Sequence, residues 1–447
     1  MSHKFIGGVR VRHNLPKVPV EPAMRLAPPS QVVVPMSLHI GKPCTPCVAV
    51  GDHVDMGQLI GEAGGPVSAP IHSPVSGTVA AVEPRLISLG FAVPSVIIDN
   101  DGQDTLYSGI RPHPEAENDP DELVRVVREA GIVGMGGATF PTAFKISSGW
   151  GKVETVIVNG AECEPGIASD YRAMLDHPQE LLRGIRLVMM GCKVSEATLV
   201  IEDNKPEAIA NLTALLPADG SIKLMPVPVR YPQGAEKQLI NTVTGREVPP
   251  GKLPADVGCS VFNVETCLAV ENAVRTGMPL IERYCTVSGT AAAEPRIMLV
   301  RIGTPVSCVF EAAGGFKCDP VKVVMGGPMM GMALFDLSVP CTKGTNGLLA
   351  FAEDATLSAE TGQCIRCGRC VEACPVRLLP TYLFMFTNRG AMDKLEEYHV
   401  SDCIECGCCT YGCPARLPLT QTFKLGKARL RNYQAAQKAK AEKEAAK

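Results

Sequence analysis

Apolar and polar residues follow two different patterns along this chain. Between residues 116 and 285, segments with apolar residues at helical spacing, such as DPDELVRVVREAGI and HPQELLRGIRLVMMGC, alternate with short Val-rich runs, such as VETVIVNG and EATLVIE. The first kind of segment predicts amphipathic helices, and the second predicts buried strands. Strands that alternate with helices are typical of an α/β domain, so we expect one here.

The segment before this domain has the short apolar runs of β-structure. Residues 1–115 contain QVVVP and SVIID among many Pro and Gly residues. Within them, VAVGDHVDMGQLIGEAGG and SAPIHSPVSGTVAAVE resemble the two halves of a lipoyl or biotinyl barrel-sandwich domain. A carrier domain of that kind presents a lysine at a hairpin tip between its halves, and none occurs between Gly57 and Gly77. We therefore expect the fold without the swinging arm.

Three further segments follow the α/β domain. Short β-runs such as IMLVRIG and KVVMGG predict a small α+β domain at residues 286–350. Residues 351–425 hold nine of the 19 cysteines, and residues 426–447 predict a basic, Ala-rich helix or tail. We expect that tail to be solvated, with contact to anionic lipid as the alternative. The Met-rich stretch VVMGGPMMGMALF predicts core packing by adaptable thioether side chains.

The composition limits the classes of protein to consider. A net charge of −3 argues against broad nucleic-acid binding. No apolar run reaches about 18 residues, which predicts no membrane span. The start, MSHKFIGG, lacks the apolar region of a signal peptide. Because a cytosolic chain rarely uses disulfides, we expect the cysteines to be thiols or metal ligands.

Two cysteine runs share the spacing C-x2-C-x2-C-x3-C-P: CIRCGRCVEACP at residues 364–375 and CIECGCCTYGCP at residues 403–414. This is the spacing of bacterial two-cluster ferredoxins, in which the fourth cysteine binds the other cluster. Zinc knuckles are the alternative, but they do not require a third and a fourth cysteine at these spacings twice. The predicted ligands are Cys364, Cys367, Cys370 and Cys413 for a first [4Fe-4S] cluster, and Cys403, Cys406, Cys409 and Cys374 for a second.

Several other cysteines have a plainer interpretation. Cys408 is extra in the second run and aligns with Arg369 of the first, which predicts a thiol beside the cluster that does not bind it. Cys44 and Cys47 form a lone CTPC with histidines nearby but no second pair at zinc spacing, so we expect a structural role. Cys163 lies between two glutamates, where lining of a site is expected rather than redox chemistry.

Two loops of the α/β domain predict a binding site. GIVGMGGATFPTAFK, at residues 131–145, brings three glycines together, and a glycine-rich backbone can approach a phosphate or a flat ring. Because this loop follows a helix rather than a strand, it is not a standard dinucleotide fingerprint. NGAECEPG, at residues 159–166, places two glutamates at the carboxyl end of a strand, where α/β sheets bind ligands.

These loops, followed by YPQGAEKQLI and VGCSVFNVET, resemble in sequence and order the NADH-oxidising flavoprotein subunit of respiratory complex I. The whole chain more closely resembles RnfC, the peripheral NAD-facing subunit of the Rnf complex. FIGG at residues 5–8, HIGKPC, GIVGMGGATFPT and NGAECEP carry that resemblance. It implies a barrel-sandwich domain, an α/β FMN-binding domain, a β-grasp (soluble-ligand-binding) domain and a helical domain with two [4Fe-4S] clusters.

The resemblance also implies roles for single residues. Glu164 would lie beside the nicotinamide as the catalytic carboxylate. Two departures weaken the match: Met135 stands where complex I has an Arg, and Ala161 where it has an Asp. The residues implied to hold non-covalently bound FMN are Gly134, Gly136, Gly137, Lys145, Asn159, Glu162, Tyr231, Gly234, Glu236, Asn263 and Thr266.

The implied function is exchange of hydride with NAD(H) and of single electrons with partner subunits. In an Rnf-type complex this would be ferredoxin:NAD oxidoreduction, coupled by membrane and peripheral partners to Na⁺ or H⁺ movement, with ferredoxin as an indirect partner. The chain would then dock on the cytoplasmic side of the membrane. A flavin-dependent cobalamin reductase, a cluster-only electron relay and a zinc-stapled scaffold are the alternatives.

Overall fold

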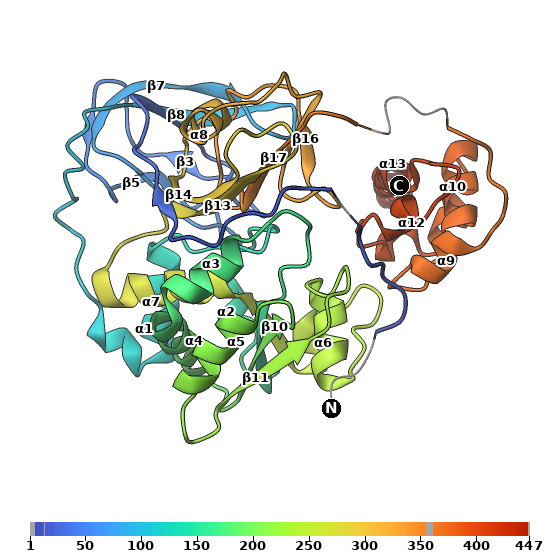
Figure 1. The fold of residues 1–447 in the computed structure, drawn as a ribbon, viewed down its shortest axis with the longest axis horizontal. Helices are drawn as coiled ribbons and strands as arrows, with labels where there is room; N and C mark the ends of the chain where they lie inside the picture. The colour runs from blue at the N-terminus through green and yellow to red at the C-terminus, as the bar shows by residue number, and fades with distance from the viewer. Residues whose placement is uncertain (1–4, 13, 355–360, 446–447) are drawn as a thin grey trace.

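The computed structural model describes residues 5–12, 14–354 and 361–445. Figure 1 shows four successive regions: a blue β-domain, a green α/β domain, a yellow-orange sheet domain and an orange-red helical domain at the C-terminus. The helical domain stands to one side of the other three, and the dark blue N-terminal segment runs beside it. The ends of the chain therefore meet where the helical domain contacts the rest.

The N-terminal domain is built from two small sheets. One has the strand order β2-β8-β7-β4 and the other β3-β5-β6. The expected strands in QVVVP and SVIID are present as β2 and within β8, which pair antiparallel. Val32, Val34, Ile60 and Ile98 are completely buried between the sheets. The strands are β2 (Gln31–Pro35), β3 (Thr45–Pro46), β4 (His53–Val54), β5 (Leu59–Glu62), β6 (Ile71–His72), β7 (Gly77–Leu86) and β8 (Ala92–Asn100).

The second domain confirms the expected α/β alternation. Its four strands are all parallel in the order β11-β10-β9-β12, so their carboxyl ends meet at one edge of the sheet. The strands are β9 (Thr155–Gly160), β10 (Ala197–Glu202), β11 (Ile222–Val227) and β12 (Cys259–Asn263). The helices are η1 (Pro114–Glu117), α1 (Pro120–Glu129), α2 (Thr142–Ser147), α3 (Ser169–Asp176), α4 (Pro178–Gly191), α5 (Pro206–Leu215), α6 (Glu236–Thr244), η2 (Pro254–Val257) and α7 (Val264–Thr276).

Helix α1 illustrates how local sequence leads into the glycine-rich loop. Asp119 caps the helix, because its side chain accepts hydrogen bonds from the backbone N–H groups of Asp121 and Glu122. Pro120 occupies the first turn, where its missing N–H costs no hydrogen bond. The helix is followed by Gly131 with a φ of +63°, a conformation that glycine adopts without strain. The chain then turns directly into the loop.

The third domain is a mixed sheet with the order β1-β14-β13-β17-β15-β16, and α8 packs on it. Strand β1 comes from the N-terminal part of the chain, and β13 begins at Glu282, before the expected boundary at residue 286. The β-grasp assignment stays a prediction. The elements are β1 (Met24–Arg25), β13 (Glu282–Ser288), β14 (Arg296–Arg301), α8 (Val306–Ala312), β15 (Lys322–Met325), β16 (Met332–Leu334) and β17 (Gly347–Phe351).

The Met-rich stretch of this domain differs from expectation. Met330 is 50% exposed, Met332 is 36% exposed and Phe335 is 60% exposed. The prediction of core packing is therefore wrong for these residues. The reason is that the stretch crosses from β15 to β16 through a surface turn, and only Val323 and Val324 on the strand side are buried.

The C-terminal domain is helical. Its elements are α9 (Arg369–Ala373), α10 (Pro380–Arg389), α11 (Met392–Glu397), η3 (Val400–Asp402), α12 (Cys408–Tyr411) and α13 (Leu419–Ala445). Helix α13 packs on α10 and α11, and it runs without a break through the expected division at residues 425 and 426. Within the described ranges, no helix has the length and apolar character needed to cross a membrane.

Candidate functional site

Three parallel strands end in polar residues at the same edge of the sheet. Asn159 of β9 lies opposite Asn263 of β12 in the register, and Glu202 ends the adjacent strand β10. The structure therefore brings the predicted residues Asn159 and Asn263 together. Sequence reasoning missed Glu202, although it follows the strand ATLVI at the same kind of position. Burial raises the pKa of Glu202 to about 7, and its Oε1 has no hydrogen-bond partner.

The glycine-rich loop is anchored to the start of helix α7. The Met135 N–H donates to Thr266 Oγ1 at 2.9 Å, and the Gly134 N–H donates to the Phe140 carbonyl at 2.8 Å. A Cβ on Gly136 would lie 3.5 Å from the Asn263 side chain. The loop thus lies against the helix N-terminus, and Thr266 serves to hold the loop in place.

Two polar residues of the site stabilise helix starts. The Asn263 Oδ1 accepts from the Glu265 N–H and so caps α7, and its Nδ2 donates to Asp170 Oδ2 at 2.7 Å. Glu162 accepts hydrogen bonds from Ser169 Oγ and from the N–H groups of Asp170 and Tyr171 at the start of α3. Burial, and then the charge of Glu162, raise the pKa of Asp170 well above its usual range.

The predicted residues after β11 lie against the acidic loop. Asn159 Nδ2 donates to the Gly234 carbonyl at 2.9 Å. A Cβ on Gly234 would lie 2.3 Å from the Ala161 carbonyl oxygen, so only glycine allows this close approach. Lys145 Nζ forms an ion pair with Glu236 Oε1 at 2.7 Å and lies 5.5 Å from the centre of the Phe262 ring. The site therefore contains one half-buried cation that is already paired.

Glu164 lies under a loop of the third domain. Its carboxylate accepts hydrogen bonds from the N–H of Met329 at 3.0 Å and from that of Met330 at 2.9 Å. Burial raises the pKa of Glu164 to about 7, although these two bonds and the nearby Tyr231 act in the opposite direction. The Tyr231 hydroxyl is buried and has no hydrogen-bond partner of normal geometry in the described part of the chain.

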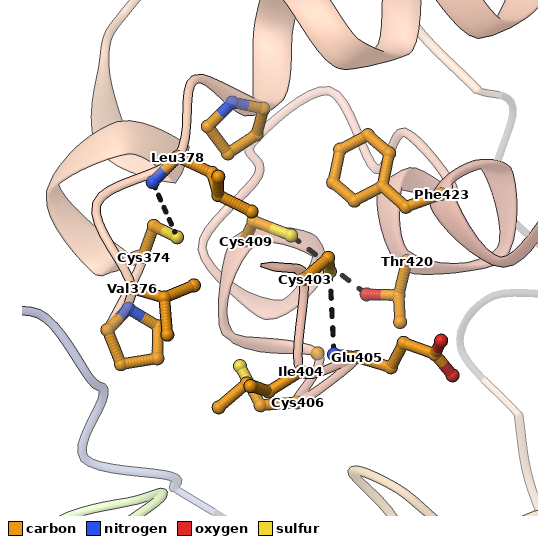
Figure 2. Close-up of a pocket in the computed structure, with 13 residues that line it drawn as sticks. Cys374, Val376, Leu378, Cys403, Ile404, Glu405, Cys406, Cys409, Thr420 and Phe423 are labelled. Atoms are coloured by element: carbon orange, nitrogen blue, oxygen red, sulfur yellow. Dashed lines mark hydrogen bonds between the residues drawn. The ribbon is translucent and has the colours of Figure 1, made fainter. Parts of the chain in front are cut away.

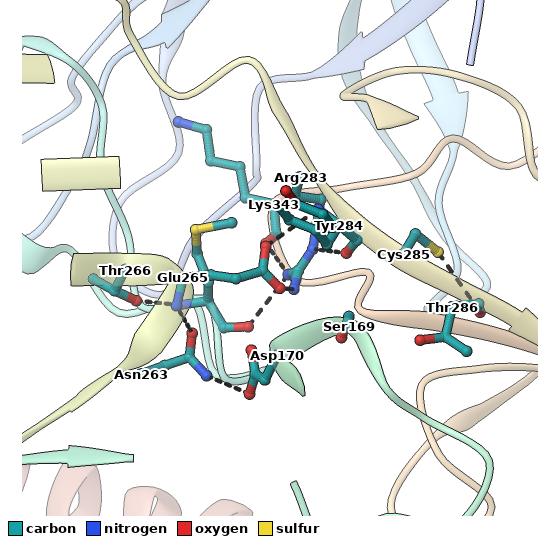
Figure 3. A network of polar contacts seen from close by, with 12 residues as sticks. Ser169, Asp170, Asn263, Glu265, Thr266, Arg283, Tyr284, Cys285, Thr286 and Lys343 are labelled. Atoms are coloured by element: carbon teal, nitrogen blue, oxygen red, sulfur yellow. Dashed lines mark hydrogen bonds and ion pairs between the residues drawn. The ribbon is translucent and has the colours of Figure 1, made fainter. Parts of the chain in front are cut away.

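A buried ion pair from outside the predicted site supports the glycine-rich loop (Figure 3). Arg283 of β13 donates to Glu265 Oε1 at 2.9 Å, and both side chains are at most 3% exposed. The same guanidinium donates to the carbonyl oxygens of Met135 and Lys343. No sequence signal pointed to this pair, because Arg283 and the loop belong to different domains.

Lys343 joins three domains. Its ammonium group, completely buried, donates to the Gly131 carbonyl at 2.6 Å and to the Pro70 carbonyl at 3.2 Å. Burial lowers the pKa of Lys343 to about 8. Because its two partners belong to the N-terminal and the α/β domains, this lysine of the third domain fixes all three around the base of the glycine-rich loop.

Four predicted cluster ligands surround one pocket in the helical domain (Figure 2). Cys374 from the first run lies with Cys403, Cys406 and Cys409 from the second, around about 330 Å³ of empty space. The Leu378 N–H donates to Cys374 Sγ at 3.2 Å, and the Glu405 N–H donates to Cys403 Sγ at 3.4 Å. The structure thus brings together the crossed set of four cysteines that the spacing predicts.

The other four predicted ligands lie in a more open place. Cys364 and Cys367 are exposed, Cys370 is buried and Cys413 is half-buried. Burial, and to a smaller extent the charges of Cys413 and Cys367, raise the pKa of Cys370, so these three thiols are neighbours. Among the residues that the structure describes, no three Cys, His, Asp or Glu side chains converge on a point suited to a single metal ion.

Cys408 faces away from the pocket. It is completely buried, and its Sγ lies 3.9 Å from the Tyr231 carbonyl in a cluster of side chains that also includes Met329 and Cys163. Cys163 Sγ accepts from the Gly234 N–H at 3.4 Å, and burial raises the pKa of this thiol far above its usual value. Both thiols therefore pack at the junction between the helical and α/β domains.

Close backbone contacts hold the helical domain at this junction. The Gly8 N–H donates to the Ala373 carbonyl at 2.9 Å, and a Cβ on Gly7 would lie only 2.5 Å from the Cys374 carbonyl oxygen. Gln238 Nε2 donates to the Pro375 carbonyl at 3.3 Å. The FIGG segment thus forms a strap over Cys374, on the side of the pocket that faces the α/β domain.

The CTPC pair is part of the β-domain core on one side only. Cys44 is buried and its S–H donates to the Ala69 carbonyl at 3.2 Å, while Cys47 is exposed. His39 Nε2 accepts from the Ala69 N–H at 3.2 Å and lies 3.5 Å from Cys44 Sγ. These contacts agree with the structural role expected for Cys44.

Comparison with known families places these features in one context. Models described as the RnfC barrel sandwich hybrid domain, the Nuo51 FMN-binding domain and the 4Fe-4S dicluster domain match residues 3–103, 127–272 and 363–417. The RnfC-type subunit of the Na(+)-translocating ferredoxin:NAD(+) oxidoreductase complex of Acetobacterium woodii is 43% identical over 376 residues, 84% of this chain and 85% of that one. The chain belongs to the RnfC family. The corresponding subunit of the proton-translocating complex of Clostridium ljungdahlii is 42% identical, over 90% of this chain and 88% of that one.

A solved structure shares the fold of this RnfC chain. A chain of an NAD+-reducing [NiFe]-hydrogenase in the H2-reduced state superposes with a TM-score of 0.52, over 71% of this chain and 64% of that chain. The sequence identity is 22%, so the likeness concerns the fold alone. Together with the matched families, it supports the barrel-sandwich, flavin and cluster domains of RnfC as separate folding units.

The residues at the sheet edge of this RnfC chain fit FMN. Gly137 has a φ of +111°, and no atom lies within 4 Å of the position of a Cβ, so the loop backbone faces open space. The buried, unpartnered Tyr231 hydroxyl marks a polar group for which a ligand can supply the partner. Met135 does not replace the arginine of complex I as a cation, because its side chain is buried. Lys145 is then the cation of the matched site.

Proposed function

We propose that this chain is the NAD-facing subunit of an ion-translocating ferredoxin:NAD oxidoreductase complex. Its relatives carry that name, and its flavin and dicluster domains supply the two kinds of electron carrier the reaction needs. The observation that carries the proposal is the junction itself. Tyr231 of the flavin domain and Cys406 and Cys408 of the cluster domain pack in one buried cluster of side chains.

FMN would be held by the residues of the sheet edge. When bound, it supplies the exchange between hydride and single electrons. The glycine-rich loop at Gly134, Gly136 and Gly137 presents its backbone, with Thr266 and Asn263 keeping it against the N-terminus of α7. A helix N-terminus favours an anion such as a phosphate, and Lys145 adds a positive charge. Asn159 keeps Gly234 against the acidic loop, and Glu236 orients Lys145.

Glu164 and Tyr231 would form the part of the site that faces NAD(H). Glu164 is held in one orientation by its two backbone donors, and Tyr231 lies next to it. Glu162, which caps α3, fixes the acidic loop in place. These side chains would place the nicotinamide, whereas the electron chemistry would come from the bound flavin.

The two clusters would have unequal positions. The ligands of the second, Cys374, Cys403, Cys406 and Cys409, lie at the junction with the flavin domain, whereas Cys364 and Cys367 of the first are exposed. Because electron transfer needs short distances between carriers, the second cluster is the one suited to exchange with the flavin, and the first is suited to a partner. That partner would be another protein of the complex, on the cytoplasmic side of the membrane.

An anaerobic visible spectrum of the purified chain tests the proposal. We expect flavin bands over a broad cluster absorbance, bleaching of both by NADH, and FMN after acid extraction. If extraction yields no FMN and NADH changes nothing, a cluster-only relay replaces the proposal. Reduction of cob(II)alamin by the chain with NADH, without activity toward the partner proteins of an Rnf-type complex, would favour the cobalamin reductase instead.

A further inference from the structure

The turn between β15 and β16 reaches across from the third domain to the flavin domain. It comprises residues 326–331, Gly-Gly-Pro-Met-Met-Gly, and is closed by a hydrogen bond from the Gly331 N–H to the Gly327 carbonyl at 2.7 Å. Its two methionine N–H groups are the donors that hold the Glu164 carboxylate, one to each oxygen. A carboxylate with a separate backbone donor on each oxygen is restricted to one orientation.

The turn has no room to spare over Glu164. A Cβ on Gly327 would lie 2.2 Å from Glu164 Oε2 and 2.6 Å from Glu164 Cβ. Glycine at 327 is therefore a condition for the two hydrogen bonds, since any side chain would push the turn and the carboxylate apart. The turn is also short of internal packing, because Met330 is half exposed. Its position depends on what it contacts.

The same turn touches the wall of the second cluster pocket. The Met329 carbonyl oxygen lies 3.0 Å from the position of a Cβ on Gly407, which lines that pocket. The Met329 side chain packs against the cluster of Tyr231, Cys406 and Cys408. One turn of the third domain is thus in contact with both the carboxylate of the flavin domain and the cysteine loop of the helical domain.

We propose that this turn is the positioning element of the NAD site: Met329 and Met330 orient Glu164 through their backbone N–H groups, and Gly327 permits it. The inference rests on the proposed function, in which Glu164 faces the nicotinamide. It adds that the third domain sets the affinity for NAD(H), and that a shift of the turn is felt at the second cluster through Met329 and Gly407. The first cluster, which the turn does not touch, is unaffected.

The variant Gly327→Ala tests this role in the complete chain with its cofactors. The added Cβ displaces the carboxylate, and we expect KM for NADH to rise about tenfold, as for loss of a hydrogen bond to a charged group, with kcat changed less. The EPR spectrum of the second cluster should shift while that of the first stays the same. FMN and iron contents should equal those of the wild type.

Two further variants make the result specific. Gly65→Ala is the matched control, because its Cβ meets nothing closer than 3.8 Å, and it should leave KM and both spectra unchanged. In a Glu164→Gln background, Gly327→Ala should add little to KM, because coupled residues are not additive. Full additivity of the two changes contradicts the positioning role.

The possible failures are distinguishable. If wild-type protein is not bleached by NADH, the proposed function fails whatever the turn does. If wild type is bleached but Gly327→Ala leaves KM unchanged, or lowers it, the turn does not position Glu164 and the inference is overturned. Should Gly327→Ala lose FMN or iron, Met330→Pro decides, because it removes one of the two donors; an unchanged KM there overturns the inference equally.

Discussion

The two cysteine runs have the same spacing but lie in different surroundings. At equivalent positions, Gly368 and Gly407 both have a φ of +79°, yet a Cβ on Gly368 would meet nothing within 4 Å, whereas one on Gly407 would meet the Met329 carbonyl oxygen at 3.0 Å. The first run faces outward with two exposed cysteines, and the second faces the flavin domain. Duplicated motifs can therefore hold equal clusters and still take unequal places in an electron path.

The strongest test of this comparison concerns the ligands. Cys409→Ser should remove the second cluster and about half of the roughly eight irons expected from two clusters. Cys408→Ser should keep all of them, because its sulfur faces Tyr231 rather than the pocket. Iron and sulfide analysis of both variants measures this. The opposite result would show that the register of the second run is shifted by one residue.

The order of the two clusters can be tested by removing one at a time. Cys364→Ser should abolish the EPR signal of the first cluster but leave bleaching of the flavin and reduction of the second cluster by NADH intact. Cys403→Ser should instead abolish NADH-driven reduction of the first cluster, because its neighbour at the junction is lost. If the first cluster is reduced equally well in wild type and in Cys403→Ser, the proposed order is wrong.

The buried side of the comparison should also respond to pH. Burial raises the pKa of Glu202 to about 7, above its usual value of 4.5. Between these values the unfolded chain binds fewer protons than the folded one, so the contribution of Glu202 to stability falls as pH rises through this range and is lowest above pH 7. Glu202→Gln removes this effect.

Relative to wild type, Glu202→Gln should therefore gain about 2 to 3 kcal/mol of unfolding free energy between pH 5 and pH 8, at about 1.4 kcal/mol per pKa unit. Denaturant titrations at the two pH values measure it. A constant difference between variant and wild type would mean that Glu202 titrates at its ordinary pKa in the folded protein.

The smallest expected effect compares the two equivalent glycines. Gly368→Ala and Gly407→Ala share the strain of a positive φ, about 1 kcal/mol for a residue with a Cβ. Gly407→Ala should cost about 1 kcal/mol more, because Met329 must move. Only Gly407→Ala should also change the EPR spectrum of the second cluster. Identical costs and spectra would show that the contact with Met329 has no consequence.

Local sequence was sufficient for much of this protein. The cysteine spacing predicted the crossed set that surrounds the pocket, and the alternation of VETVIVNG and EATLVIE with helices predicted the parallel sheet. The order of the loops indicated the RnfC family, which the relatives confirm. These features are carried by residues close together in the chain, where spacing and periodicity express the structure directly.

The long-range contacts were decided only in three dimensions. Arg283 reaches Met135 from another domain, Lys343 joins three domains, and the turn at Met329 and Met330 covers Glu164. Nothing in the sequence near these residues predicts their partners, since each contact depends on how separately predicted domains pack. For the same reason the sequence predicted two equivalent clusters, and only the tertiary structure, by burying one run against the flavin domain, made them different.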